Sequence, residues 1–312
     1  MDFYKKMLKW YFNFKLLLNP KFRKSFCKVK KYFREIDGSK KEELSKYLSL
    51  HFFISFKDGY LNSDIGKKDL EDQMINRLLS FRHHAIPWIN SIVSLKGSKV
   101  LEIGCGTGST AVALAEQGCN LTSIDIAEAH IKVAKKRCEL YDLQANISLM
   151  NAMDINKINE KFDLIIFSAS LEHMTYEERL ASIKSAWNIL NKNGFLVIIE
   201  TPNRLYYFDE HSSRLPFYHW LPDQIAVQYS KYSLRELFVS NSCDEISLIR
   251  FGRGVSFHEF ELALNIRCSD FEVYSMQPFE KTFISNIVFD EFKYSKFLKK
   301  TWSSKYIGGF LL

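Results

Sequence analysis

The sequence predicts an α/β fold with a doubly wound, mostly parallel sheet. Short apolar runs alternate with helical stretches from residue 99 to residue 200, which is the pattern of strands that are each followed by a helix. Residues 162–168 form an apolar run typical of a strand buried on both faces. A glycine-rich turn follows the first run directly, at residues 104–108. These three features indicate parallel strands that are connected by helices.

Seven strands are expected in chain order. They are residues 99–103, 120–125, 147–150, 162–168, 195–200, 245–251 and 283–290. Helices are expected at residues 109–117, 127–141 and 175–190, the last of which begins with the capping spacing Thr175-x-x-Glu178. We expect three regions: a basic, amphipathic, helical extension over residues 1–80, a core over residues 81–251 with a lid insertion at 203–232, and a C-terminal extension over residues 252–312.

Composition excludes several classes of protein. Of the 312 residues, 46% are hydrophobic, which is enough for a core and too apolar for a disordered chain. The six cysteines are scattered without a C-x-x-C pair, so we expect neither a disulfide framework nor a metal site. Free cysteines also indicate a reducing compartment. Charges interrupt every apolar stretch before it reaches the roughly 20 residues of a membrane span. A cytoplasmic protein is therefore expected.

The positive charge of the chain is concentrated in an N-terminal arm. Residues 1–34 hold eleven lysines or arginines and one acid, whereas the whole chain carries a net charge of +7. Aromatic and aliphatic residues recur at helical spacing between these charges. Three interpretations stay open for residues 1–36. The apolar face packs on the protein body, or the arm attaches peripherally to an anionic membrane surface at its inner, cytoplasmic face; nucleic-acid binding by the arm is the least favoured.

The glycine turn differs from the usual dinucleotide-binding fingerprint. That fingerprint would need a glycine at position 109, where the chain has Ser109, and Glu102 stands two residues before the first glycine. A carboxylate there would repel a pyrophosphate but would suit a ligand that carries a cation. The segment Glu102-Ile-Gly-Cys-Gly-Thr-Gly108 resembles the first motif of class I S-adenosylmethionine-dependent methyltransferases. This resemblance implies a Rossmann-like fold and S-adenosyl-L-methionine as the cofactor.

The resemblance also implies which residues contact the cofactor. The turn glycines would let the main chain pass beneath it, and Glu102 would engage its polar end. Asp125, at the end of the second strand, would accept hydrogen bonds from the ribose hydroxyls, or would only cap the next helix. Many relatives carry Gly-Asp-Ala after the third strand, where this chain has Asn151 in place of the aspartate, with Asp154 as the alternative. The expected cofactor contacts are Glu102, Gly104, Cys105, Gly106, Gly108, Asp125, Ile126, Asn151, Ala152, Met153 and Ser168.

Three histidines are candidates for catalysis. Leu171-Glu172-His173 follows the fourth strand and resembles a loop of many small-molecule methyltransferases. His211 and His219 lie in the long loop after the fifth strand, which we interpret as a substrate lid because loops of this length are usually functional. A neutral imidazole can take a proton from a hydroxyl near neutral pH. A purely structural role remains the alternative for His173, and no metal is expected at the adjacent Asp209, Glu210 and His211.

The sequence therefore predicts a methyltransferase that acts on oxygen of a small molecule or of a glycoconjugate such as a surface-polysaccharide precursor. One alternative is an enzyme with a lipid or quinone acceptor at the membrane surface. Another is a protein that binds S-adenosyl-L-methionine without turnover. Nucleic acid is not expected as a partner, because the chain lacks the Asn/Asp-Pro-Pro-Tyr/Phe/Trp motif of many base-methylating enzymes and its body is nearly neutral.

Overall fold

The computed structural model describes residues 20–235, 238, 244–267 and 310–311, and the chain forms two compact units, Met1–Asn151 and Ala152–Leu312. The first part of the arm, residues 1–19, lies outside the described residues, as does the strand expected at residues 283–290.

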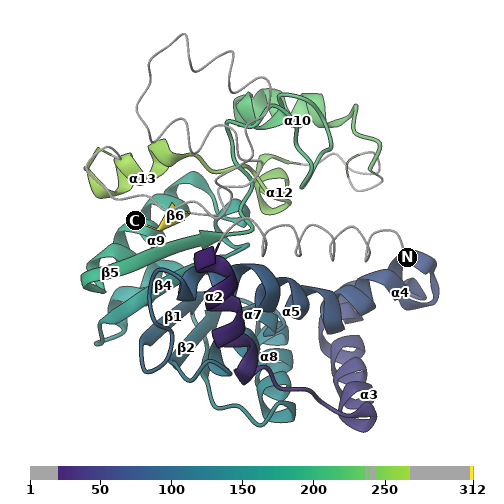
Figure 1. Ribbon diagram of the computed structural model, residues 1–312. Coiled ribbons are helices and arrows are strands. Elements are labelled where there is room, and N and C mark those ends of the chain that lie inside the picture. Colours follow the sequence, from purple (N-terminus) through teal and green to yellow (C-terminus); the bar gives the residue numbers. More distant parts are fainter. Residues whose placement is uncertain (1–19, 236–237, 239–243, 268–309, 312) are drawn as a thin grey trace. The chain divides into compact units, whose positions relative to one another are not determined.

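Three parallel strands form the centre of the first unit, in the order β3-β2-β1. They are β1 (Lys99–Ile103), β2 (Asn120–Asp125) and β3 (Asn146–Leu149). Helix α7 (Ser109–Ala115) connects β1 to β2, and α8 (Glu128–Leu140) connects β2 to β3, beside the strands (Figure 1). All residues of α7 are buried, which is possible because its small and aliphatic side chains pack closely. The parallel strand–helix pattern expected from the sequence is confirmed here.

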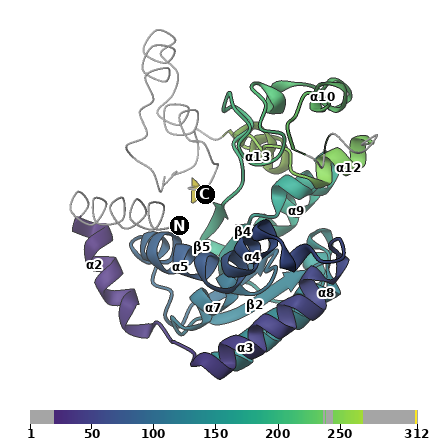
Figure 2. The ribbon, with the colours of Figure 1, turned by 90° about the vertical axis from the view of Figure 1, so that its right-hand side faces the viewer.

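Helices precede these strands. They are α3 (Gly38–Tyr47), η2 (Leu48–Phe52), η3 (Phe53–Ser55), η4 (Tyr60–Asn62), α4 (Asp64–Glu71), η5 (Asp72–Asn76), α5 (Arg77–Ser80), η6 (Phe81–Ala85) and α6 (Ile86–Asn90). From α4 to α6 the helix is continuous but contains two π-helical segments, η5 and η6, and such segments often occur near functional sites. Helix α3 lies along α8 (Figure 2).

The described part of the basic arm packs on the first unit. Helix α2 (Pro20–Val29) buries Phe22, Phe26 and Val29 and contacts α6, and η1 (Lys30–Tyr32) follows it. The Nδ2 of Asn90 donates a hydrogen bond of 3.1 Å to the Oγ of Ser25. For residues 20–29, the apolar face is therefore occupied by the protein body.

The second unit contains the parallel pair β4 (Phe162–Ser168) and β5 (Leu190–Ile199), with the antiparallel, two-residue β6 (Phe310–Leu311) beside β5. Short helices η7 (Ala152–Lys157) and η8 (Leu171–His173) flank β4, and α9 (Tyr176–Asn188) leads to β5. The expected capping box at Thr175 and Glu178 starts α9. The described residues thus hold five strands of four residues or more and the short β6, where seven strands were expected.

The strand expected at residues 245–251 is instead a helix, α12 (Glu245–Arg250). The side chain of Asp244 caps it by accepting a hydrogen bond of 2.7 Å from the N–H of Ser247. Leu248 and Ile249 are buried whereas Ile246 is exposed, so burial follows the helical repeat and not the alternation of a strand.

The insertion after β5 is folded around a small core of its own. It contains η9 (Tyr218–Trp220) and α10 (Asp223–Ser230), and α13 (Phe257–Leu264) follows α12. Tyr218, Ala226 and Leu248 form the centre of this core. The segment expected as a lid is therefore an ordered substructure, and Figure 1 shows α10 and α12 in it.

Candidate functional site

The glycine turn closes the end of β1 against β2. The N–H groups of Gly104 and Cys105 both donate to the carbonyl oxygen of Ile124, at 2.9 and 3.1 Å. Gly104, Gly106 and Gly108 all have positive φ angles, of 84°, 50° and 85°. A side chain is strained in this backbone conformation, so the three glycines are required by the path of the chain.

Gly108 is required for a second reason. A Cβ atom at this position would lie 2.8 Å from the Cα of Ala134 in α8, which is closer than packed atoms approach. Gly108 is also the residue that precedes the first turn of α7. The N-terminus of α7 therefore begins close against α8, with its free N–H groups at the turn.

A buried arginine supports the turn from within the first unit. Arg137 of α8 donates to the Oγ of Ser109 at 3.0 Å and to the carbonyl oxygen of Gln73 at 2.8 Å. Thr107 of the turn donates to the Oε1 of Gln73, also at 2.8 Å. Burial lowers the pKa of Arg137 to about 10. No pattern in the sequence indicates a role for this residue, because a basic side chain on a helix usually faces solvent.

Glu102 is fully buried at the centre of β1. The Oγ of Ser123 donates a hydrogen bond of 2.7 Å to its Oε2, whereas its Oε1 has no hydrogen-bond partner among the described residues. Burial raises the pKa of Glu102 to about 7, against the opposing effect of the Ser123 hydrogen bond. A buried carboxylate oxygen without a partner is costly, so this site favours a ligand that donates a hydrogen bond.

Asp125, at the end of β2, is connected to the turn. Its Oδ2 accepts from the N–H of Gly106 at 2.8 Å, and its Oδ1 accepts from the N–H of Ala127 at 2.9 Å. The Nδ1 of His130 lies 3.1 Å from Oδ1. Burial alone would raise the pKa of Asp125, but His130 and the two N–H donors outweigh it and lower the pKa, so the carboxylate is ionised. His130 is a neighbour that sequence reasoning missed.

The remaining expected contacts of the cofactor lie as follows. Ile126 is exposed directly after Asp125, and Asn151 follows Met150, whose N–H donates to the carbonyl oxygen of Asp125 at 3.0 Å. In the second unit, Ala152 and Ser168 are buried and Met153 is exposed. Asp154, the alternative to Asn151, forms an exposed ion pair with Lys157 at 2.9 Å.

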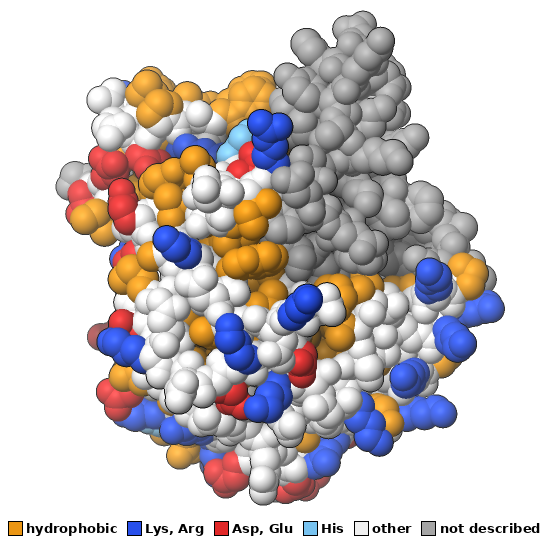
Figure 3. All heavy atoms as spheres, turned by 90° about the vertical axis from the view of Figure 1, so that its left-hand side faces the viewer, with side chains coloured by type: hydrophobic (Ala, Val, Ile, Leu, Met, Phe, Trp, Pro, Cys, Tyr) orange, Lys and Arg blue, Asp and Glu red, His pale blue; other side chains and the backbone are white. Residues whose placement is uncertain are grey.

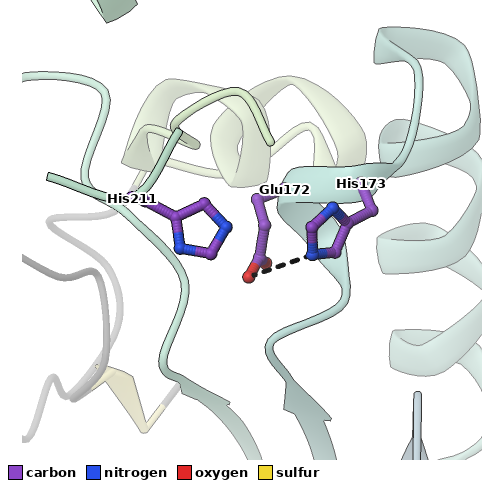
Figure 4. A group of neighbouring side chains, drawn as sticks. All are labelled: Glu172, His173 and His211. Atoms are coloured by element: carbon purple, nitrogen blue, oxygen red, sulfur yellow. Dashed lines mark ion pairs between the residues drawn. The ribbon is translucent and has the colours of Figure 1, made fainter. Parts of the chain in front are cut away.

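In the second unit, acid–base side chains gather around Glu172 (Figure 4). Glu172 is fully buried, and its Oε2 accepts a hydrogen bond of 3.0 Å from the Oγ1 of Thr201 at the end of β5. Its Oε1 has no hydrogen-bond partner among the described residues and lies 3.9 Å from the Nε2 of His173. Burial raises the pKa of Glu172. The Nδ1 of His173 is 2.8 Å from the carbonyl oxygen of Arg250, which orients the ring.

His211 approaches the same carboxylate from the insertion, and Figure 4 shows Glu172 between the two imidazoles. The rings of His173 and His211 are 5.7 Å apart between centroids. Gly252 packs against His211, since a Cβ there would lie 2.6 Å from its Cδ2. Burial, followed by the nearby charge of His173, lowers the pKa of His211 to about 4. Its imidazole is therefore neutral at pH 7.

His219 has a different environment. It is buried, its Nδ1 accepts from the N–H of Gly254 at 3.1 Å, and its Nε2 lies 3.1 Å from the Oδ1 of Asp209 without hydrogen-bond alignment. Asp209 in turn accepts hydrogen bonds from the backbone and hydroxyl groups of Ser212 and Ser213. The two nitrogens of His219 thus face Gly254 and Asp209, and Asp209 holds the turn at residues 209–213.

The chemistry of the Glu172 cluster also fits a metal ion. One ligand atom from each of Glu172, His173 and His211 lies within 4.8 Å of the others, and two histidines with one carboxylate form a donor set that transition metals use. The triplet weighed from the sequence, Asp209-Glu210-His211, does not converge, because Asp209 holds its own turn and Glu210 is exposed.

Comparison with known proteins identifies the central segment. Residues 100–194 match a protein-family model described as a methyltransferase domain. The chain carries a class I S-adenosylmethionine-dependent methyltransferase domain. S-adenosyl-L-methionine is accordingly the cofactor of this domain.

Curated relatives of the methyltransferase domain are named ubiquinone biosynthesis O-methyltransferase. The protein of Coxiella burnetii (strain Dugway 5J108-111) is 33% identical over 119 residues, which are 38% of this chain and 50% of the relative. That of Pseudomonas aeruginosa (strain UCBPP-PA14) is 34% identical over 128 residues, with the same shares. The chain thus spans about half the length of these relatives. A solved magnesium protoporphyrin IX methyltransferase from Synechocystis PCC 6803 with bound SAH is 16% identical, with a TM-score of 0.43 over 72% of this chain and 87% of that chain.

The residues of the methyltransferase domain fit this cofactor. The unpartnered Oε1 of Glu102 suits a ligand with an ammonium group, and the backbone at Gly106 leaves open space where a Cβ would stand. Asp125 is ionised and already tied to the turn. Two carboxylates that accept hydrogen bonds, beside an open backbone, suit a small ligand with both a cation and hydroxyl groups.

The surface of the described residues adds two findings. No helix among residues 20–267, as far as they are described, has the length and apolarity needed to cross a membrane. Figure 3 shows Lys and Arg side chains spread among hydrophobic and acidic ones over the described part of one face.

Proposed function

We propose that this chain is an O-methyltransferase that transfers the methyl group of S-adenosyl-L-methionine to a hydroxyl of a small-molecule acceptor. The cofactor supplies a methyl group activated by a sulfonium, so the protein contributes positioning and proton transfer. The observation that carries the proposal is the cluster of Glu172, His173 and His211, because methylation of a hydroxyl requires that its proton be accepted.

Glu102 and Asp125 are proposed to hold the cofactor. Glu102 would accept a hydrogen bond from its ammonium group through Oε1, and Asp125 would accept from its ribose through the lone pairs that Gly106 and Ala127 leave free. The other predicted contacts, from Gly104 to Ser168, retain their proposed roles in shaping the pocket and packing on the adenine.

His211 is proposed as the group that takes the proton from the acceptor. It is neutral at pH 7, and the buried carboxyl of Glu172 lies close enough to stabilise the imidazolium that would form. His173 would orient Glu172 from the other side. His219 is proposed to hold the turn, since its two nitrogens face Asp209 and Gly254.

Cofactor binding is tested first, by calorimetric titration with S-adenosyl-L-methionine and with its demethylated product. We expect both to bind, Asp125→Ala to lose binding, and His130→Ala to retain it within about tenfold. His130→Ala is the matched control because it removes a neighbour of Asp125 but leaves the carboxylate. Tight binding by a folded Asp125→Ala variant would contradict the assigned role.

The acceptor is tested by methyl transfer from labelled cofactor to two classes of hydroxyl. One class is glycoconjugate precursors such as nucleotide sugars, which the sequence suggested. The other is phenolic quinone precursors, which the names of the curated relatives favour. His211→Ala should abolish most turnover with either class while cofactor binding persists. Unchanged turnover would exclude His211 as the base, and loss of wild-type turnover in EDTA would assign a metal to the cluster. Cofactor binding without turnover on any acceptor would favour a protein that only binds the cofactor.

A membrane acceptor makes a separate prediction about the arm. Because Phe22, Phe26 and Val29 are buried, a deletion through residue 36 would disrupt the first unit, and the informative deletion ends at residue 19. If the arm attaches to membranes, the full chain should sediment with anionic vesicles more than the deleted chain does. Equal sedimentation would mean that residues 1–19 do not attach the chain to membranes.

A further inference from the structure

A cavity of about 320 Å³ lies within the second unit, apart from the Glu172 cluster. It is lined by the first turns of α9 and α10, by α12 and α13, and by the segments around residues 204 and 253, and Figure 1 shows these helices. Its volume is within the range of small-molecule sites. None of Glu172, His173 and His211 lines it.

The charges in this cavity do not balance. Arg179, Arg204 and Arg253 line it together with two acids. Arg179 pairs with Glu259 at 3.2 Å, and Arg253 pairs with Asp223 at 3.0 Å. The paired arginines also donate to backbone carbonyl oxygens, for example Arg179 to that of Arg253 at 2.9 Å and Arg253 to that of Tyr218 at 2.7 Å. Each acid is therefore neutralised by one arginine, and the third arginine is in surplus.

Arg204 is that surplus cation. Its side chain is partly buried, and no hydrogen bond or ion pair of its guanidinium is found among the described residues. The acids whose charge acts on it, Glu259 and Asp223, are already paired with the other two arginines. Burial lowers its pKa from the ordinary value, which reflects the cost of holding the charge away from water. A guanidinium in this position is stabilised by a carboxylate or a phosphate, to which it donates two parallel hydrogen bonds.

The backbone of Arg204 is held firmly. Its N–H donates to the carbonyl oxygen of Val255 at 3.0 Å. Gly254 lies so close that a Cβ there would be 2.7 Å from the Cα of Arg204. The arginine is thus fixed at the edge of the cavity by a glycine that no other residue could replace without displacing it.

The rest of the wall is largely apolar. Met174, Pro222, Ile249 and Leu262 line the cavity, and Tyr176 adds an aromatic ring. A ligand with a single anionic group and an apolar body would match both the surplus charge and these side chains.

We propose that this cavity is a binding site for a small molecule that carries a carboxylate or a phosphate on an apolar body, with Arg204 as the partner of the anionic group. The site is independent of the proposed methyl transfer, because binding to it is measured without cofactor and without turnover.

The test is calorimetric titration of the full chain with benzoate, phenyl phosphate and neutral benzamide at low salt. We expect one anionic probe or both to bind, and benzamide to bind at least tenfold more weakly. The two anions separate the alternatives: preferred benzoate indicates a carboxylate ligand, and preferred phenyl phosphate a phosphate ligand. If no probe binds, or if benzamide binds as well as the anions, the proposal is wrong.

Variants assign the binding to this cavity. Arg204→Gln should weaken binding of the anion at least tenfold, about 1.4 kcal/mol, whereas Arg204→Lys should keep part of it. Arg214→Gln is the matched control, because Arg214 is exposed in the same insertion and does not line the cavity. A second variant, Leu262→Glu, places a negative charge at the exposed rim and should also weaken binding. Wild-type binding in both Arg204→Gln and Leu262→Glu would overturn the proposal.

Discussion

Replacing Glu102 by glutamine is expected to stabilise the ligand-free protein at alkaline pH and to weaken cofactor binding. Glu102 is fully buried, and one of its oxygens has no hydrogen-bond partner among the described residues. Burial raises its pKa from 4.5 to about 7. Glutamine has nearly the same shape and cannot ionise, so the variant isolates the effect of the charge.

The size and sign of the effect follow from this pKa. Between pH 4.5 and pH 7 the folded protein holds a proton on Glu102 that the unfolded chain has released. The contribution of Glu102 to the free energy of unfolding is therefore complete below pH 4.5. It is lost as pH rises through 7, which lowers the free energy of unfolding by about 3 kcal/mol. In Glu102→Gln this loss is absent. The variant should thus gain about 3 kcal/mol over the wild type in free energy of unfolding between pH 4.5 and pH 8.

The assay is urea unfolding of both proteins at several pH values from 4.5 to 8, without cofactor. Glu128→Gln is the control, because Glu128 is an exposed glutamate of the same unit, paired with Lys132. It should change stability by no more than about 0.5 kcal/mol. Titration of Glu102→Gln with S-adenosyl-L-methionine should show at least a tenfold loss of affinity. If wild type and Glu102→Gln show the same pH dependence, the buried charge has been misjudged and the reasoning fails.

Three further outcomes are expected. Gly108→Ala should destabilise the protein by about 1–3 kcal/mol in urea unfolding, because its Cβ would lie 2.8 Å from the Cα of Ala134; unchanged stability would mean that α8 yields easily. Arg82→Met should lower the free energy of unfolding in urea by about 3–5 kcal/mol, because the guanidinium that lies 2.7 Å from the buried carboxylate of Glu116 is removed. The double variant with Glu116→Met should recover part of this loss of stability. At saturating cofactor, where the ionisation of Glu102 does not limit binding, turnover should persist from pH 7 to 5.5 and fall towards pH 4, because protonation of His211 with a pKa of about 4 removes the base; an acid limb near 6.5 at saturating cofactor would contradict the burial of this ring.

The local path of the chain around the turn could be predicted from the sequence because it depends on neighbouring residues. Glycines at 104, 106 and 108 indicate a tight turn, and all three have the positive φ angles that such a turn uses. The helix start at Thr175 and Glu178 depends on a spacing of three residues and was also predicted correctly.

Other features depend on contacts between distant residues, and a single sequence does not contain them. Arg137 reaches Gln73, which lies 64 positions earlier in the chain, so its burial has no local signature. His211 owes its lowered pKa to burial, which includes the packing of Gly252 on its ring. The strand predicted at residues 245–251 was wrong for a related reason. Ile246, Leu248 and Arg250 alternate as in a strand, but the cap at Asp244 and the burial of Ile249 stabilise a helix.

The carboxylate of Asp209 has a consequence for how acceptor preference can change. By binding Ser212 and Ser213 it holds the 209–213 turn from inside, and the exposed rings of Tyr207, Phe217 and Trp220 take no part in those bonds. The residues that fix the insertion are thus different from those that it exposes at its surface, where the proposed acceptor would bind. Substitutions at the three rings could therefore create new specificities, in evolution or in directed selection, without first having to rebuild the scaffold that displays them.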